Sequence, residues 1–256
     1  MSRDIWTLCE GPSRVARLAL TAWRVVEAQH RVSTRRLVDT LEEQALLEQI
    51  VDEVKPPRPT DPRFDKLHFL LFTPFRHPPL RYGSRFGTPS EPGIWYGAKL
   101  VETCLAEKSY YQLVFVAGTK ARLENLDCLW SAFRAQIAAA RGVDLTAAPF
   151  TRFDGEISSP TSYASTHALG AAMRADGVEA CLFRSARCPK HGTAVALFQP
   201  AFASPHPLGA AQTWRCTVTA AGCEVSQTNL SETKVLVFDR AQFEVDGRLP
   251  IPSLMA

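Results

Sequence analysis

The sequence predicts an α+β fold, because helix-like and strand-like segments mix without the steady strand–helix–strand repeat of a doubly wound sheet. The chain has 256 residues and 46% of them are hydrophobic, enough to bury a sizeable core. Closely spaced prolines at residues 55–63 force an extended connection. We therefore expect a helical N-terminal extension over residues 1–54, a linker over 55–63 and a main domain over 64–256.

The extension is predicted to hold two helices. Residues 12–29 have apolar side chains at helical spacing with arginines elsewhere, which is typical of an amphipathic helix. Ser33 can cap a second helix over residues 33–52. The basic side chains of these segments could form a binding module, although a solvated helix face more often explains such charges. They are Arg14, Arg17, Arg24, Arg31, Arg35 and Arg36.

The main domain is predicted to alternate between strands and helices. Short apolar runs indicate strands, longer patterned segments indicate helices, and Gly222 is expected to turn a hairpin. The expected strands are 66–73, 111–118, 180–185, 194–199, 213–219 and 234–239, and the expected helices are 98–110, 123–141 and 161–175.

Composition excludes several functional classes. A net charge of +3 is too small to predict direct nucleic-acid binding. The seven cysteines include no C-x-x-C pair, which favours buried thiols in a reducing compartment and no metal site. The N-terminus lacks the apolar core of a secretory signal, and no run is long enough to span a membrane, so we expect a cytoplasmic protein. Dinucleotide-binding, P-loop, zinc-protease and serine-hydrolase motifs are absent from the sequence.

A segment rich in glycine, proline and aromatic residues, RYGSRFGTPSEPGIWYGAKLVETCLAE, carries the first candidate site residues. On the helix that ends it, Glu107 falls beside an apolar stripe of Leu100, Cys104 and Tyr111. A carboxylate in that position is costly to bury unless it is paired or used. The pattern alone leaves a functional role and a salt bridge to an arginine equally open.

Arg85 lies between two glycine-containing dipeptides, where backbone can approach a ligand closely. Its guanidinium fork suits a pyrophosphate, and the alternative is that it bonds loop carbonyls. Trp95 and Tyr96 are either core residues or a stacking surface.

Four motifs in order resemble the RES domain, the toxin half of bacterial Xre–RES toxin–antitoxin pairs. They are Arg85 in GSRFG, Tyr96 in IWYGA, Glu107 in CLAE and Ser185 in DGVEACLFRSAR. The resemblance covers about residues 67–240 and implies an ADP-ribosyltransferase-like split sheet with flanking helices. The family also has an earlier arginine, for which Arg76 is our assignment and Arg81 the competitor.

The resemblance further implies that the chain cleaves the nicotinamide–ribose bond of NAD⁺, which is a substrate, without a cofactor. Glu107 would stabilise the oxocarbenium-like transition state. Arg85 and Arg76 would hold the pyrophosphate. Tyr96 would stack on the cationic nicotinamide, and Ser185 would bond the nicotinamide or its ribose.

Three further residues are candidates for this site. Arg187, two residues after Ser185, would share its strand face and touch substrate. His167 and Tyr163 precede the serine segment and either face the pocket or fill core and surface positions.

Three functions follow as hypotheses. The first is an NAD⁺-degrading toxin that is neutralised by an Xre-family antitoxin. The second is a protein ADP-ribosyltransferase that uses the same site on a host protein acceptor. The third is the non-enzymatic module of basic N-terminal helices, which could instead dock the antitoxin or a second copy of the chain.

Overall fold

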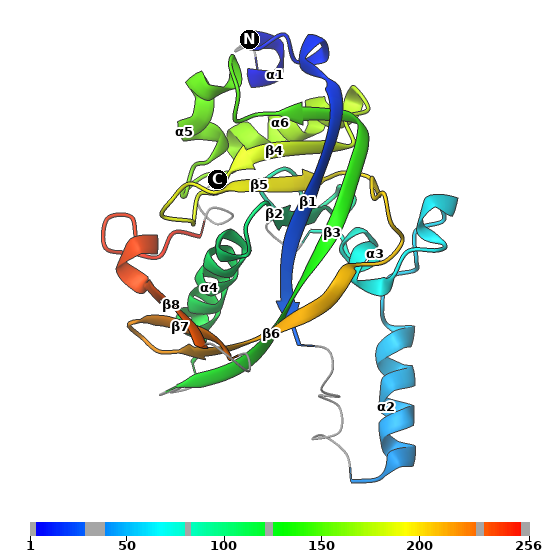
Figure 1. The fold of residues 1–256 in the computed structure, drawn as a ribbon, viewed down its shortest axis with the longest axis vertical. Helices are drawn as coiled ribbons and strands as arrows, with labels where there is room; N and C mark the ends of the chain where they lie inside the picture. The colour runs from blue at the N-terminus through cyan, green and yellow to red at the C-terminus, as the bar shows by residue number, and fades with distance from the viewer. Residues whose placement is uncertain (1–3, 29–38, 80–82, 121–124, 229–232, 252–256) are drawn as a thin grey trace.

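The computed structural model describes residues 4–28, 39–79, 83–120, 125–228 and 233–251. These residues form a mixed α+β structure in which helices flank a twisted sheet (Figure 1), which confirms the predicted fold class. The helices are α1 Ile5–Leu8, α2 Leu41–Glu53, α3 Phe69–Arg76, α4 Val101–Gly118, α5 Asp154–Ile157 and α6 Ala164–Ala175. The strands are β1 Ala16–Glu27, β2 Trp95–Ala98, β3 Leu126–Asp144, β4 Ala180–Arg184, β5 Thr193–Leu197, β6 Leu208–Val218, β7 Gly222–Thr228 and β8 Thr233–Asp239.

The sheet is organised around the long strand β3. Within the described residues the strand order is β1-β2-β5-β4-β3-β6-β7-β8, and β1 also pairs with β3. Strands β1, β2, β5, β4 and β3 therefore close into a ring, while β6, β7 and β8 continue the sheet beyond it (Figure 1). Strand β4 runs parallel to β3, and the other pairings of these strands are antiparallel.

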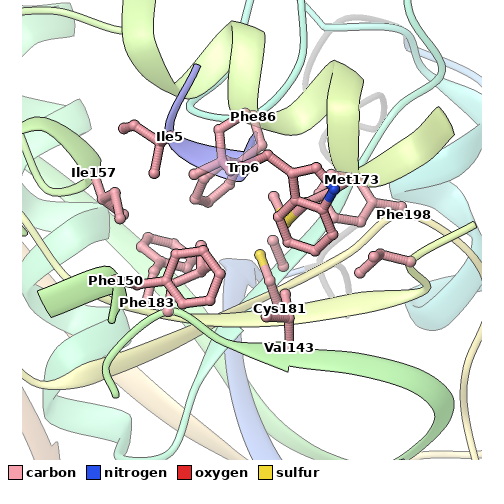
Figure 2. Packing of buried hydrophobic residues seen from close by; sticks show 14 of the residues in the cluster. Ile5, Trp6, Phe86, Val143, Phe150, Ile157, Met173, Cys181, Phe183 and Phe198 are labelled. Atoms are coloured by element: carbon pink, nitrogen blue, oxygen red, sulfur yellow. The ribbon is translucent and has the colours of Figure 1, made fainter. Parts of the chain in front are cut away.

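Apolar side chains fill three regions around this sheet. The ring strands share one cluster that contains Trp95 and Ile137, and α3 adds Leu71 to it. Helix α4 covers β6 and β7 through a second cluster that contains Leu113. Helices α1 and α6 cover the outer face of β4 and β5, where Figure 2 shows Trp6 and other rings packed together.

The predicted helix over residues 12–29 is wrong, because β1 occupies Ala16–Glu27 and pairs with β3 along its length. Its alternate side chains enter different clusters: Ala22 faces the ring interior, while Trp23 and Val25 face the α4 side. A strand that is apolar on both faces loses the period-2 pattern that identifies half-buried strands. These residues belong to the sheet, so they do not form the helical extension or the basic helical module expected from the sequence.

The predicted helix over residues 123–141 is also wrong, because β3 occupies Leu126–Asp144. The buried face of this strand changes midway, from Trp130 and Ala132 on the α4 side to Phe133 and Ile137 on the ring side. The change breaks the alternation, and the alanines in this segment favour helix by intrinsic propensity.

Two predicted strands are helical. Residues 66–73 overlap α3, where the His68 side chain accepts a hydrogen bond from the Leu70 amide at the first turn. Residues 111–118 complete α4, which the sequence predicted only to residue 110. Short apolar runs do not separate a strand from a buried helix. The α4 stripe was misjudged as well, because Leu100 is 59% and Tyr111 54% exposed.

Other elements match the sequence. Helix α6 and strands β4, β5, β6 and β8 lie where they were expected, and β6 and β7 form a hairpin that pairs Val218 with Cys223, next to Gly222. Helix α2 covers the later part of the predicted helix over 33–52, whose residues up to 38 lie outside the described ranges. Residues 55–61 have no regular helix or strand.

Candidate active site

Arg85 sits in a tight turn that the backbone closes on itself. The Ser84 amide donates to the Gly87 carbonyl at 2.7 Å, and the reverse bond measures 3.2 Å. The Phe86 ring, fully buried at 5.0 Å from the Phe183 ring, anchors the turn to the core (Figure 2). The Arg85 side chain is therefore carried by a rigid support.

The Arg85 guanidinium is buried, with 7% of the residue exposed. Its Nη1 donates to the carbonyls of Ile157 at 2.9 Å and Ser159 at 3.1 Å, and its Cζ lies 5.0 Å from the centre of the Tyr163 ring. The loop-carbonyl contact that was the alternative interpretation is thus present. Among the described residues no carboxylate forms an ion pair with Arg85, so only neutral groups contact its charge there.

Tyr96 holds the Arg85 turn in place. Its hydroxyl accepts a 3.1 Å bond from the Phe86 amide and lies 3.0 Å from the Ser84 hydroxyl. Burial raises the pKa of Tyr96, so the hydroxyl remains neutral and able to donate. Its neighbour Trp95 is fully buried, as the core interpretation expected.

Glu107 and Ser185 meet directly. Ser185 follows the end of β4, and its hydroxyl donates to Oε1 of Glu107 on α4. The same hydroxyl oxygen accepts bonds from the amides of Arg187 at 3.2 Å and Cys188 at 3.0 Å. The serine is completely buried and the glutamate partly exposed, so the carboxylate has a fixed side and an open side.

Arg187 is a second buried cation beside this pair. The strand that was predicted to carry it ends at Arg184, so Arg187 lies in the following loop. Its Nη2 donates to the Pro160 carbonyl at 2.8 Å, and its Cζ lies 3.7 Å from the centre of the Tyr110 ring. The residue is 3% exposed and, within the described ranges, has no carboxylate partner.

Three tyrosines surround these groups. The hydroxyls of Tyr111 and Tyr163 lie 3.3 Å apart and connect α4 to the start of α6. Burial raises the pKa of Tyr110 to about 12, with the nearby charge of Arg187 opposing the rise and that of Glu107 adding to it. Although 54% of Tyr111 as a whole is exposed, its hydroxyl lies against that of Tyr163, and burial of this end raises its pKa, with Glu107 adding to the rise. Sequence reasoning missed Tyr110, although its position three residues after Glu107 places both on neighbouring turns of one helix.

His167 supports the arginine turn from α6. Its Nε2 lies 2.8 Å from the Ser84 carbonyl oxygen. Because a carbonyl only accepts, Nε2 carries a proton in this contact. His167 therefore contacts the turn that carries Arg85.

Arg76 is not brought to this group. It lies on α3, which Figure 1 shows on the other side of β3 from α4, and its Nε donates to the Pro56 carbonyl. Its competitor Arg81 lies outside the described residues. The structure thus joins Arg85, Tyr96, Glu107, Ser185 and Arg187 but sets Arg76 apart.

Two absences hold over the described parts of the chain. No group of three or more histidine, cysteine, aspartate or glutamate side chains could hold a metal ion there. No helix in those parts is both long and apolar enough to cross a membrane.

The fold and this cluster define an α+β protein with a carboxylate–serine pair and two buried arginines. The model of the RES domain family matches residues 55–219, well over half of the sequence, and the chain therefore belongs to the RES domain family. The sequence resemblance is confirmed.

Comparison with solved structures finds the crystal structure of the M. tuberculosis MbcT–MbcA toxin–antitoxin complex. The two chains share 12% identity with a TM-score of 0.45, over 94% of this chain and 96% of the other. No curated protein matches the sequence.

Proposed function

We propose that this chain is an NAD⁺-cleaving toxin that breaks the bond between nicotinamide and ribose. The observation that carries the proposal is a pair of buried arginines, Arg85 and Arg187, with no carboxylate partner among the described residues. Uncompensated buried cations favour an anionic ligand. The pyrophosphate of NAD⁺ supplies such a group, and RES membership makes this substrate the leading expectation.

Both arginines keep donors for that ligand. A guanidinium carries five N–H donors. Only Nη1 of Arg85 and Nη2 of Arg187 bond carbonyl oxygens of the described residues. The 157–160 loop therefore orients both side chains and leaves their remaining N–H groups free to bind phosphate oxygens.

Glu107 is the group we assign to the chemistry. Departure of nicotinamide leaves positive charge on the ribose, and a carboxylate fixed nearby stabilises that transition state more than the ground state. The bond from the Ser185 hydroxyl orients the carboxylate, and the two amides that donate to Ser185 orient the hydroxyl in turn. Nicotinamide leaves as a neutral base, so the step requires no separate general acid.

The test compares two glutamates on one helix. Purified wild type, Glu107→Gln and Glu102→Gln are incubated with NAD⁺, and free nicotinamide is followed by chromatography. Glu107→Gln keeps an acceptor for Ser185 but removes the charge, so we expect a rate loss of roughly 100- to 1,000-fold. Glu102, which pairs with Lys234 at the surface, is the matched control and should retain full activity. Equal rates in all three proteins would refute the assignment of Glu107.

The acceptor of ADP-ribose is distinguished in the same assay. Free ADP-ribose indicates water, its phosphate ester indicates phosphorolysis, and label bound to added protein indicates the alternative protein ADP-ribosyltransferase. We also infer that an Xre-family antitoxin neutralises the activity. Absence of nicotinamide release with water, phosphate and protein acceptors all present would reject NAD⁺ cleavage.

A further inference from the structure

A cavity of about 250 Å³ lies between β1 and α3, apart from the candidate active site. Its walls are Arg24, Val26, Phe69, Leu70, Thr73, Pro74 and His77. Val26 and Ala22 of β1 face the ring interior, whereas Trp23 and Val25 between them face α4. The cavity therefore opens on the face of β1 opposite to the helix that carries Glu107.

Arg24 brings an unbalanced positive charge to this cavity. Its Nη1 donates to the Tyr96 carbonyl at 2.5 Å, and its Cζ lies 5.4 Å from the centre of the Trp95 ring. Its Nε is buried without a hydrogen-bond partner, and no carboxylate in the described parts of the chain forms an ion pair with it. Burial lowers the pKa of Arg24 to about 10, as expected for a cation whose charge is poorly compensated.

The rest of the cavity is mostly apolar. Val26, Phe69, Leu70 and Pro74 provide hydrocarbon walls. The Thr73 hydroxyl donates its proton to the Phe69 carbonyl at 2.6 Å, so it offers a ligand only acceptor capacity. A bound anion would consequently place its charged group on Arg24 and its body against the apolar walls.

Size and donor geometry narrow the class of ligand. The volume is below the range of about 300–1,000 Å³ that is usual for drug-sized ligands. The flat two-oxygen edge of a carboxylate matches the guanidinium fork, whereas a phosphate dianion would bring further charge and oxygens that the mostly apolar walls leave unpaired. We propose that the cavity between β1 and α3 binds a small carboxylate with an aromatic or aliphatic body, and that Arg24 binds its carboxylate group.

The first experiment uses benzoate and its neutral analogue benzamide as probes. Their dissociation constants are measured by saturation-transfer NMR with the full chain. Wild type is expected to bind benzoate roughly 10- to 100-fold more tightly than benzamide, because only benzoate offers Arg24 a charged hydrogen-bond acceptor. Equal affinity for the two probes, or no binding of benzoate, would overturn the proposal.

Variants then locate the site. Arg24→Met should abolish the preference for benzoate, while Arg17→Met, at an exposed position of the same strand, should keep it. Because Arg24 also bonds the Tyr96 carbonyl, Thr73→Phe is the second variant: it fills the cavity and leaves the arginine in place. Benzoate binding that survives both Arg24→Met and Thr73→Phe, or that excess NAD⁺ displaces, would place the probe elsewhere and contradict the proposal.

Discussion

Neutral groups hold both cations of the candidate site. Carbonyl oxygens of residues 157–160 accept from Arg85 and Arg187, and the rings of Tyr163 and Tyr110 lie against the two guanidinium groups. Dipoles and π faces orient a cation but do not cancel its charge, whereas a carboxylate would cancel it. These contacts leave the positive charges of both buried arginines uncompensated, which is why we expect an anionic substrate there.

Tyr96→Phe separates two roles for this tyrosine. The substitution keeps the ring but removes the hydroxyl that bonds the Phe86 amide and the Ser84 hydroxyl. We expect the free energy of unfolding to fall by about 1–3 kcal/mol, because a buried amide loses its acceptor. We also expect the Michaelis constant for NAD⁺ to rise as the Arg85 turn loosens. Urea unfolding and steady-state kinetics measure the two effects.

A different result would favour the role predicted from the sequence. If Tyr96 acts only by stacking its ring on nicotinamide, Tyr96→Phe should leave both stability and the Michaelis constant nearly unchanged. Unchanged values would therefore exclude the support of the turn as the function of this hydroxyl.

Helices α2 and α4 differ in how much of their apolar surface packs against the core. Figure 1 shows α2 standing away from the sheet, while α4 lies across it. Ile50 of α2 is 47% exposed and Leu113 of α4 is 1% exposed. Burial of apolar area, and not helix propensity, provides most of the stability that a helix contributes to a protein.

Matched truncations test this contrast. Ile50→Ala is expected to change the free energy of unfolding by less than about 0.5 kcal/mol, since surface substitutions have small effects. Leu113→Ala is expected to lower it by about 2–5 kcal/mol through the cavity it leaves in the α4 cluster. Thermal and urea unfolding of both variants give the comparison. A large loss from Ile50→Ala would mean that α2 packs against the domain in solution.

Sequence reasoning succeeded where local pattern and tertiary burial agree. Strand β4 is buried from Ala180 to Phe183 and was recognised from its apolar run, whereas β3 changes its buried face midway and was not. For the site, spacing and family resemblance identified Arg85, Glu107 and Ser185. The carbonyl acceptors at residues 157–160 have no sequence pattern, because any residue supplies a backbone oxygen.

The candidate site depends on segments that are distant along the chain. The Arg85 turn, α4, the 157–160 loop and the loop after β4 each contribute a contact, and α4 meets the loop after β4 through the Ser185–Glu107 bond and the packing of Arg187 on the Tyr110 ring. A site of this kind exists only when the whole domain is folded. The pKa values of its buried tyrosine hydroxyls, like those of thiols in the core, therefore differ between the folded and the unfolded chain.

Alkaline pH should destabilise the molecule through groups that burial keeps neutral. Burial raises the pKa of Cys104 from 9.0 to about 12, with Arg24 opposing the rise, and that of Tyr110 from 10.0 to about 12. Below about pH 8 both groups are protonated in the folded and unfolded chains, so neither makes stability depend on pH. The folded chain binds more protons than the unfolded chain between about pH 9 and 12 at Cys104 and between about pH 10 and 12 at Tyr110. Over each interval the free energy of unfolding falls by up to about 1.4 kcal/mol per pH unit for that group.

Urea unfolding at intervals from pH 8 to pH 11 measures this dependence. Cys104→Ala and Tyr110→Phe each remove one titrating group, so each variant should lose less stability over this range than wild type does. Glu102→Gln is the control, because its carboxylate is ionised throughout the interval and should leave the slope unchanged. Variants whose stability falls as steeply with pH as that of wild type would show that Cys104 and Tyr110 ionise as readily in the folded chain as in the unfolded one, which the burial of both side chains argues against.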